Sequence, residues 1–174
     1  MDPLVVPHDP VWRESFESAS ALVMRALGSN AIAVHHIGST AISGVWAKPV
    51  IDMLVAVEEL GVVDGCRAAM AELGYEWKGE YGIPSRRYFR RHDRHGRRTH
   101  HLHVFPSNNE RIARHLAFRD FLIAHPEWAA RYSDLKRDLA KRFPKSGLDY
   151  SAGKATFIER IDALAAKWRG PAAK

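Results

Sequence analysis

The sequence predicts an α+β fold, in which a mixed β-sheet core carries flanking helices and a helical C-terminal third. Three observations lead to this prediction. Two apolar segments, 31–37 and 50–57, are joined by a connection that begins at a Gly-Ser turn. A third segment of strand character, 100–105, is stopped by Pro106. After Pro106 the remaining segments all have helical spacing, which indicates a sheet with helices attached to it.

The segments before residue 75 alternate between helix and strand patterns. Pro10–Leu27 has apolar residues at helical spacing and ends at Gly28, a natural stop. Ala31–Ile37 is expected to be a buried strand. Val50–Val57 is apolar on both parities, which is typical of a strand interior to a sheet. Glu58–Leu73 is amphipathic and predicts a helix packed on that sheet.

The later segments complete the sheet and then form the helical third. Tyr75–Trp77 and Arg86–Arg91 are predicted strands on either side of a Gly/Pro-rich loop. The predicted helices are Glu110–Ala124, Pro126–Phe143 and Tyr150–Trp168. We expect one domain over residues 1–174, with the sheet core in 1–107, a helical part packed on it in 108–169, and a tail at 170–174.

Composition narrows the class of protein. The chain is 46% apolar and 26% charged, an ordinary globular balance, and no apolar run approaches the ~20 residues of a membrane span. Cys66 is the single cysteine, and the N-terminus lacks a signal-peptide pattern, so we expect a cytoplasmic protein that does not bind membranes. The net charge of +6 allows phosphorylated partners. No RNA- or DNA-binding motif matches, so a nucleotide or other phosphorylated small molecule is the expected partner rather than nucleic acid.

The Gly-Ser turn and the strand after it form the first candidate site. Gly38 lets the backbone approach a ligand closely, and Ser39 and Thr40 place hydroxyls beside exposed amides, so we expect these three residues to receive phosphates. Asp52 is an acid inside an otherwise apolar strand, and such an acid needs an ion-pair partner, a hydrogen bond or a cation. Lys48, the nearby arginines and Mg²⁺ are candidate partners, and local structural pairing is the alternative.

A pair of histidines forms the second candidate site. His101 and His103 alternate along a predicted strand and therefore share one face. Two such imidazoles can bind a metal, hold phosphate or move protons, or they can be ordinary hydrogen-bonded sheet residues. No cysteine or regularly spaced acid completes a zinc pattern.

Basic residues and one further acid complete the candidate set. Arg86 and Arg87 follow the Gly/Pro loop and have the planar fork that suits phosphate. Lys154 lies four residues after Tyr150 and could reach a nucleotide phosphate from a helix, and Lys48 is expected to neutralise phosphate charge with it. Glu80 is either a second metal-binding carboxylate or the partner of an arginine.

Taken in order, five segments resemble the GrpB family (UPF0157 type), which is grouped with the nucleotidyltransferase superfamily. They are HIGSTAISGVWAKPVIDMLV at 36–55, GEYGIPSRRYF at 79–89, THHLHVFP at 99–106, HLAFRDFL at 115–122 and YSAGKATFI at 150–158. The resemblance implies a nucleotidyltransferase-like mixed sheet. It also implies that Gly38 and Ser39 match the triphosphate-holding turn and that Asp52 matches one position of an Asp-x-Asp metal motif, with Mg²⁺ or Mn²⁺ as cofactor.

The sequence departs from that superfamily pattern next to Asp52. The positions two residues away are Val50 and Leu54, so the second acid is absent, and histidines stand where a third acid is usual. Three functions therefore stay open. The first is nucleotidyl transfer from a nucleoside triphosphate to an acceptor, with Asp52, His101 and His103 as catalytic residues. The second is nucleotide binding without catalysis. The third is phosphate hydrolysis like that of histidine-triad proteins, although Phe105 replaces their third histidine.

Overall fold

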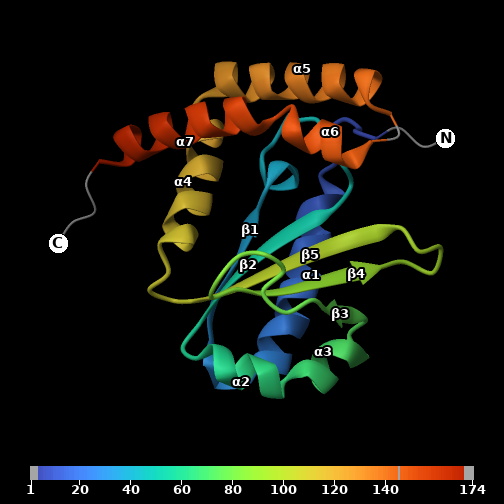
Figure 1. Cartoon of the computed structure of the whole chain (residues 1–174), viewed down its shortest axis with the longest axis vertical. Helices are drawn as coiled ribbons and strands as arrows, with labels where there is room; N and C mark the ends of the chain where they lie inside the picture. The colour runs from blue at the N-terminus through green and yellow to red at the C-terminus, as the bar shows by residue number, and fades with distance from the viewer. Residues whose placement is uncertain (1–3, 145, 171–174) are drawn as a thin grey trace.

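The computed structural model describes residues 4–144 and 146–170 of the chain. Five strands of the described residues form one mixed sheet in the order β1-β2-β5-β4-β3, flanked by helices, so the predicted α+β class is confirmed (Figure 1). The predicted tail residues 171–174 lie outside the described residues. The strands are β1 (Ala31–Ile37), β2 (Ile51–Val57), β3 (Tyr75–Trp77), β4 (Arg87–His92) and β5 (Arg98–Pro106).

The centre of the sheet is a parallel pair, β2 and β5, while the other neighbouring strands pair antiparallel. The interior position that the apolar sequence of β2 predicts is therefore confirmed. In the register of this pair, Asp52 lies opposite His101 and Leu54 lies opposite His103. Residues opposite one another share a face, so Asp52 and both histidines project from the same side of the sheet.

The opposite face of the sheet is covered by α1 (Val11–Leu27), α2 (Leu60–Gly65) and α3 (Arg67–Glu72). Alternate β2 residues, Met53 and Val55 among them, pack there with α1 into the largest apolar core. Burial of this continuous apolar layer provides the main stabilisation of the sheet. The face that carries Asp52 is thereby left to the second group of helices.

The C-terminal helices lie over the face that carries Asp52. They are α4 (Glu110–Ala124), α5 (Pro126–Arg142), α6 (Gly147–Ala152) and α7 (Ala155–Arg169). Leu54 and Phe105 form a small core with Ile112 and Leu116 of α4. Helices α4, α5 and α7 share a core of their own, and in Figure 1 α5 and α7 run along roughly the same direction beyond one end of the sheet. None of the described helices has the length and apolar character needed to cross a membrane.

Two predicted helices are each divided in the structure. The predicted helix Glu58–Leu73 is broken at Cys66, directly after Gly65, a residue that weakens helices. The predicted helix Tyr150–Trp168 is α6 followed by α7, with the break at Gly153. A Cβ at Gly153 would collide with Leu139 of α5, so the break lets the chain pack closely against that helix.

Candidate functional site

The Gly-Ser turn lies directly against the Asp52 carboxylate. Strand β1 ends at Ile37, Gly38 has φ 71°, and residues Ser39–Ala41 form a short 3-10 turn. A Cβ on Gly38 would lie 2.5 Å from Asp52 Oδ2, so a side chain is excluded both by this contact and by the backbone conformation. The turn can approach the acid this closely because residue 38 is a glycine.

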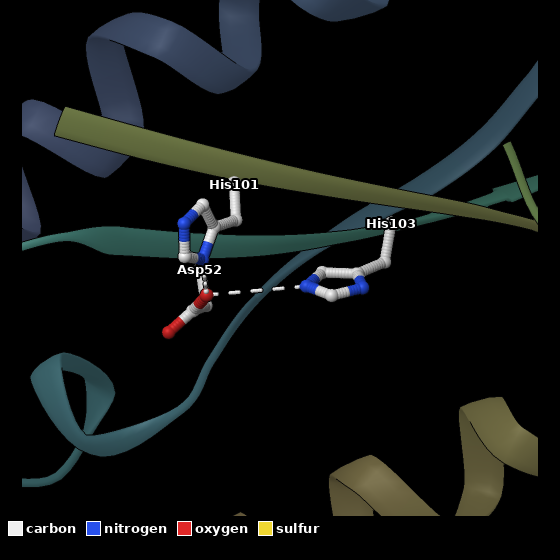
Figure 2. Close-up of side chains that lie close together, drawn as sticks. All are labelled: Asp52, His101 and His103. Carbon is white, nitrogen blue, oxygen red and sulfur yellow. Dashed lines mark hydrogen bonds and ion pairs between the residues drawn. The ribbon is translucent and has the colours of Figure 1, made fainter. Parts of the chain in front are cut away.

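Asp52, His101 and His103 meet above the central strand pair, as Figure 2 shows. His101 Nδ1 lies 2.9 Å from Asp52 Oδ1, and His103 Nε2 lies 3.9 Å from the same oxygen. One donor atom from each of the three residues lies within 4.8 Å of the other two, a spacing that could hold a metal ion. The parallel register of β2 and β5 creates this group from residues 49 positions apart.

The carboxylate is held in its ionised form. Burial raises the pKa of Asp52, but the hydrogen bond from His101 and the nearby His103 outweigh it, and the pKa falls well below its ordinary value. An ionised carboxylate only accepts hydrogen bonds, so His101 Nδ1 carries the proton that it donates to Oδ1. His101 Nε2 is therefore the lone-pair nitrogen, and it is buried with no hydrogen-bond partner among the described residues.

Arg86 determines which His103 nitrogen carries a proton. Arg86 Nη1 lies 3.3 Å from His103 Nδ1, and a guanidinium can only donate, so Nδ1 accepts. The proton of the neutral ring is then on Nε2, facing Asp52. Arg86 is 5% exposed and also donates to the carbonyl oxygens of Glu80 and Tyr81, which fixes its position.

A cavity of about 500 Å³ opens beside Asp52 on the side of the Ser39 turn. Lys48 Nζ and Lys154 Nζ lie 4.2 and 4.7 Å from the centre of the Tyr150 ring, and both side chains line the cavity. Burial lowers the pKa of each lysine, and Lys48 lowers that of Lys154 further. The lining also includes Ser39, Thr40, Arg98, His101, Lys136 and Ser151.

Lys136 is the residue of this cavity that the sequence analysis missed. It is 2% exposed, and its Nζ has no hydrogen-bond partner within the described part of the chain. Burial, with a smaller contribution from Lys154, lowers its pKa to about 6. The available signal was its place on the buried stripe of α5, where it follows Ala129, Tyr132 and Ser133 at helical spacing. Arg98, which also lines the cavity, was missed as well.

Several predicted site residues lie elsewhere or are already engaged. Arg87 pairs with Asp64 at 2.6 and 2.9 Å on the opposite face of the sheet, the side to which its register partner Val104 belongs. Glu80 accepts from the Ser85 amide and is not part of the group around Asp52. Thr40 lines the cavity, but its hydroxyl is bonded to His36 and to the Val50 carbonyl.

The match to a family model decides the relationship of the chain to known proteins. The model described as GrpB protein covers residues 3–163. The chain belongs to the GrpB family. The UPF0157 protein YqkA of Bacillus subtilis is 39% identical over 165 residues, 95% of this chain and 48% of that protein. The glutamate-rich protein GrpB of Alkalihalophilus pseudofirmus is 31% identical over 91% of this chain and 92% of its own length.

Some relatives are longer than this GrpB-family chain. It spans about half of YqkA and 65% of the UPF0157 protein PA4798 of Pseudomonas aeruginosa, which is 36% identical. Its structure is similar to the crystal structure of conserved protein GrpB from Enterococcus faecalis, with a TM-score of 0.92 at 39% identity over 96% of this chain and 99% of that one.

A more distant likeness concerns the fold alone. A mutant of the Cid1 poly(U) polymerase bound to MgATP matches with a TM-score of 0.56 at 12% identity, over 86% of this chain and 50% of that one. The predicted nucleotidyltransferase-like arrangement of the sheet and its flanking helices is confirmed by this match.

Proposed function

We propose that this GrpB-family chain binds a nucleoside triphosphate with a divalent cation and transfers the nucleotidyl group to an acceptor hydroxyl. The observation that carries the proposal is the convergence of the Ser39 turn, the lysines and Asp52 on one cavity. Its volume of about 500 Å³ is within the ~300–1,000 Å³ typical of pockets for small organic ligands. The nucleotidyltransferase-like fold supports the same assignment.

The charge of the cavity favours a polyanion. Lys48, Lys136, Lys154 and Arg98 line it, and Asp52 is the one carboxylate among its described lining residues. Burial is the main cause of the lowered pKa values of the three lysines, and a neighbouring cation lowers each of them further. Phosphate oxygens would offset the repulsion between these cations and give Lys136 Nζ a hydrogen-bond partner, which the described residues do not provide.

The donor chemistry fits a cation bound by Asp52 and phosphate oxygens. Asp52 Oδ1 is engaged by the histidines, so Oδ2 is the oxygen left for a metal. Mg²⁺ and Mn²⁺ prefer such oxygen ligands, and when bound they neutralise phosphate charge. Binding by all three residues would need His103 Nε2 to give up its proton, which would leave an N–H at Nδ1 facing Arg86. The histidines therefore fit better as groups that orient Asp52.

The transfer itself follows from the positions of these groups. The acceptor oxygen forms a bond to the α-phosphorus, the bond to the bridging oxygen breaks, and pyrophosphate leaves. The hydroxyl proton passes to solvent, and His101, which donates from Nδ1 to the Asp52 carboxylate, keeps that acid in position. His103 holds the carboxylate in place, and the lysines bind the departing phosphates.

Nucleotide binding without transfer is the second candidate function. It is favoured by the composition of the group around Asp52, which among the described residues has one carboxylate and two imidazoles where the superfamily pattern has further acids. Hydrolysis by a histidine triad has no comparable support. Phe105, at the position of the third histidine, is 1% exposed in the apolar core with Ile37 and Leu54.

Nucleotide titration tests the proposed binding. ATP, CTP, GTP and UTP are titrated calorimetrically with Mg²⁺ or Mn²⁺ into wild type, Asp52→Asn, Lys136→Met and Arg87→Met. We expect wild type and Arg87→Met to bind one nucleotide alike, because Arg87 lies on the opposite face. The other two variants should bind at least about tenfold more weakly, since each loses a charged contact. Absence of binding to wild type contradicts both candidate functions.

Product analysis separates transfer from binding alone. The nucleotide that binds is supplied with an α-phosphate label and a mixture of hydroxyl-bearing acceptors, and pyrophosphate release is followed. Labelled product that is lost in His101→Gln but kept in Arg87→Met supports transfer. Saturable nucleotide binding without pyrophosphate release supports the non-catalytic candidate.

A further inference from the structure

Asp52 lies at the junction of two cavities. The larger, lined by lysines, has been described above. A smaller one of about 230 Å³ lies towards α4 and α7 and also includes Asp52 in its lining. Its other lining residues are Ile37, Gly38, His103, Arg114, His115, Phe118, Tyr132, Ile158 and Asp162.

Neighbouring residues of the site are divided between the two cavities. Ser39 and His101 line the larger cavity, whereas Gly38 and His103 line the smaller one. At the turn, neighbouring residues therefore line different cavities, and the same is true of the two histidines of β5. Asp52 lines both cavities. A phosphorus atom bound at Asp52 would therefore be approachable from two directions.

In-line displacement needs such an arrangement, because the attacking oxygen and the leaving group lie on opposite sides of the phosphorus. We propose that the smaller cavity binds the acceptor, and that this acceptor is a small hydroxylated amine whose ammonium group contacts Asp162. The inference rests on the proposed function for the identity of the reaction, while binding of the amine can be measured without nucleotide.

The walls of the smaller cavity select against phosphate-bearing acceptors. Ile37, Phe118 and Ile158 provide apolar surface, and Arg114, the guanidinium among the described lining residues, is already paired with Asp162. Its volume is below the ~300 Å³ lower bound typical of drug-sized ligands, so the acceptor must be small. A short hydrocarbon chain with a polar group at each end would fit both the apolar walls and the small volume.

Asp162 provides the preference for a cation. Arg114 Nε and Nη2 lie 2.9 and 2.6 Å from the same oxygen, Oδ2. Oδ1 is buried and receives no hydrogen bond from the described residues. Buried carboxylate oxygens nearly always have a donor, and the described residues do not supply one to Oδ1, so it is free to accept a hydrogen bond from a ligand. With Asp52 also present, the two carboxylates face one arginine, and an ammonium group would balance the charge.

Methyl NMR can detect weak binding at this cavity through Ile37 and Ile158. The probes are ethanolamine and its longer homologues, the diols of matching length, and the matching hydroxy acids, each added without nucleotide. We expect saturable shifts at both methyl groups with an amino alcohol and at least about tenfold weaker binding of the matching diol. Equal or tighter binding of a hydroxy acid would overturn the charge assignment, and no shift with any amino alcohol would overturn the site.

Two variants test the cavity by different means. Asp162→Asn should weaken amino-alcohol binding about tenfold, since it loses the charged contact. Because the Arg114–Asp162 pair also joins α4 to α7, Ile158→Trp is the second variant; it fills the cavity without changing charge and should abolish the shifts at Ile37. Asp134→Asn, 75% exposed on α5, is the matched control and should bind as wild type does. Unchanged shifts in Ile158→Trp would contradict the proposal.

Nucleotide titration of the same variants keeps the two proposals distinguishable. Amino-alcohol binding by a wild type that binds no nucleotide would defeat the proposed function and leave the smaller site established. Normal nucleotide binding in Asp162→Asn and Ile158→Trp, with the amine lost, would support separate subsites. Joint loss of both ligands in folded Ile158→Trp would show that the two cavities do not act as separate subsites.

Discussion

The backbone of Gly38 packs directly against the carboxylate of Asp52, because a Cβ on Gly38 would lie 2.5 Å from Asp52 Oδ2. The turn that ends β1 therefore fixes the position of the acid on the neighbouring strand. A change at either residue should alter the other, and the chain offers a control for the effect of backbone conformation alone.

Gly38→Ala should destabilise the fold and disable the site. The substitution places a side chain at φ 71° and pushes on Asp52, so we expect a loss of about 2–3 kcal/mol in the free energy of unfolding. Nucleotide binding in the presence of Mg²⁺ should fall by more than this stability loss explains. Urea unfolding and calorimetric titration provide the two measurements.

Gly44→Ala is the matched control for that experiment. Gly44 also has a positive φ, 77°, but nothing lies within 4 Å of an added Cβ. It should cost about 1 kcal/mol through backbone strain alone and leave nucleotide affinity unchanged. Equal losses of affinity in both variants would show that the contact with Asp52 is unimportant.

Lys136→Met should stabilise the ligand-free protein at neutral pH. Burial makes the Lys136 side chain give up its proton at neutral pH, and methionine avoids this cost, so the variant is expected to gain about 1–3 kcal/mol. The pKa of Lys136 is about 6 in the folded chain against an ordinary 10.5, so between these values the unfolded state binds more protons. Wild-type stability should then rise with pH, by up to ~1.4 kcal/mol per unit, and the advantage of the variant should shrink.

The measurement is urea unfolding of both proteins from pH 6 to pH 10, the window set by that shift. Lys141→Met, an exposed position near the end of the same helix, is the control and should track wild type. A stability difference between wild type and Lys136→Met that stays constant over the whole window would show that Lys136 keeps its ordinary pKa.

Arg86 should control the tautomer of His103. With Arg86 donating to Nδ1, ¹⁵N NMR of the imidazoles should show the Nε2–H form of His103 in wild type. Arg86→Met should give a mixture of tautomers and lower stability by about 1–3 kcal/mol, because the carbonyls of Glu80 and Tyr81 lose their donor. A wild-type ring with its proton on Nδ1 would refute this hydrogen-bond assignment.

Arg87→Met should affect stability and leave ligand binding unchanged. Its guanidinium forms a two-contact pair with Asp64, and its loss should cost about 1 kcal/mol. Since Arg87 lies on the face covered by α1–α3, nucleotide affinity should equal that of wild type. A tenfold loss of affinity would place Arg87 in the site after all.

The sequence was sufficient to predict the sheet and the acid at its centre. Alternation and apolar runs predict β2 and β5 well, and an isolated acid within β2 draws attention to Asp52. What the pattern could not show is the register of a parallel pair 49 residues apart, which brings His101 to Asp52. Register depends on tertiary packing rather than on either segment alone.

Arg87 and Lys136 illustrate why the remaining site residues were harder to predict. The sequence offers no reason to distinguish Arg86 from Arg87. Consecutive residues in an extended chain point to opposite faces, however, so Arg86 contacts His103 and Arg87 contacts Asp64 on the other face of the sheet. Lys136 occupies a buried helical position, and a lysine in an amphipathic helix is ordinarily assigned to the solvent face. The environment of each side chain depends on which surface is buried, and that depends on how the helices pack against the sheet.

The larger cavity takes one lysine from the connection before β2 and two from the C-terminal helical region. Without a ligand, the charges of Lys48 and Lys154 repel one another across the boundary between the sheet and the C-terminal helices. A bound polyanion would attract the lysines on both sides of this boundary, so that ligand binding would hold the sheet and the helices together and stabilise the fold. Resistance to proteolysis would then show whether the cavity is occupied, even when the bound ligand does not react.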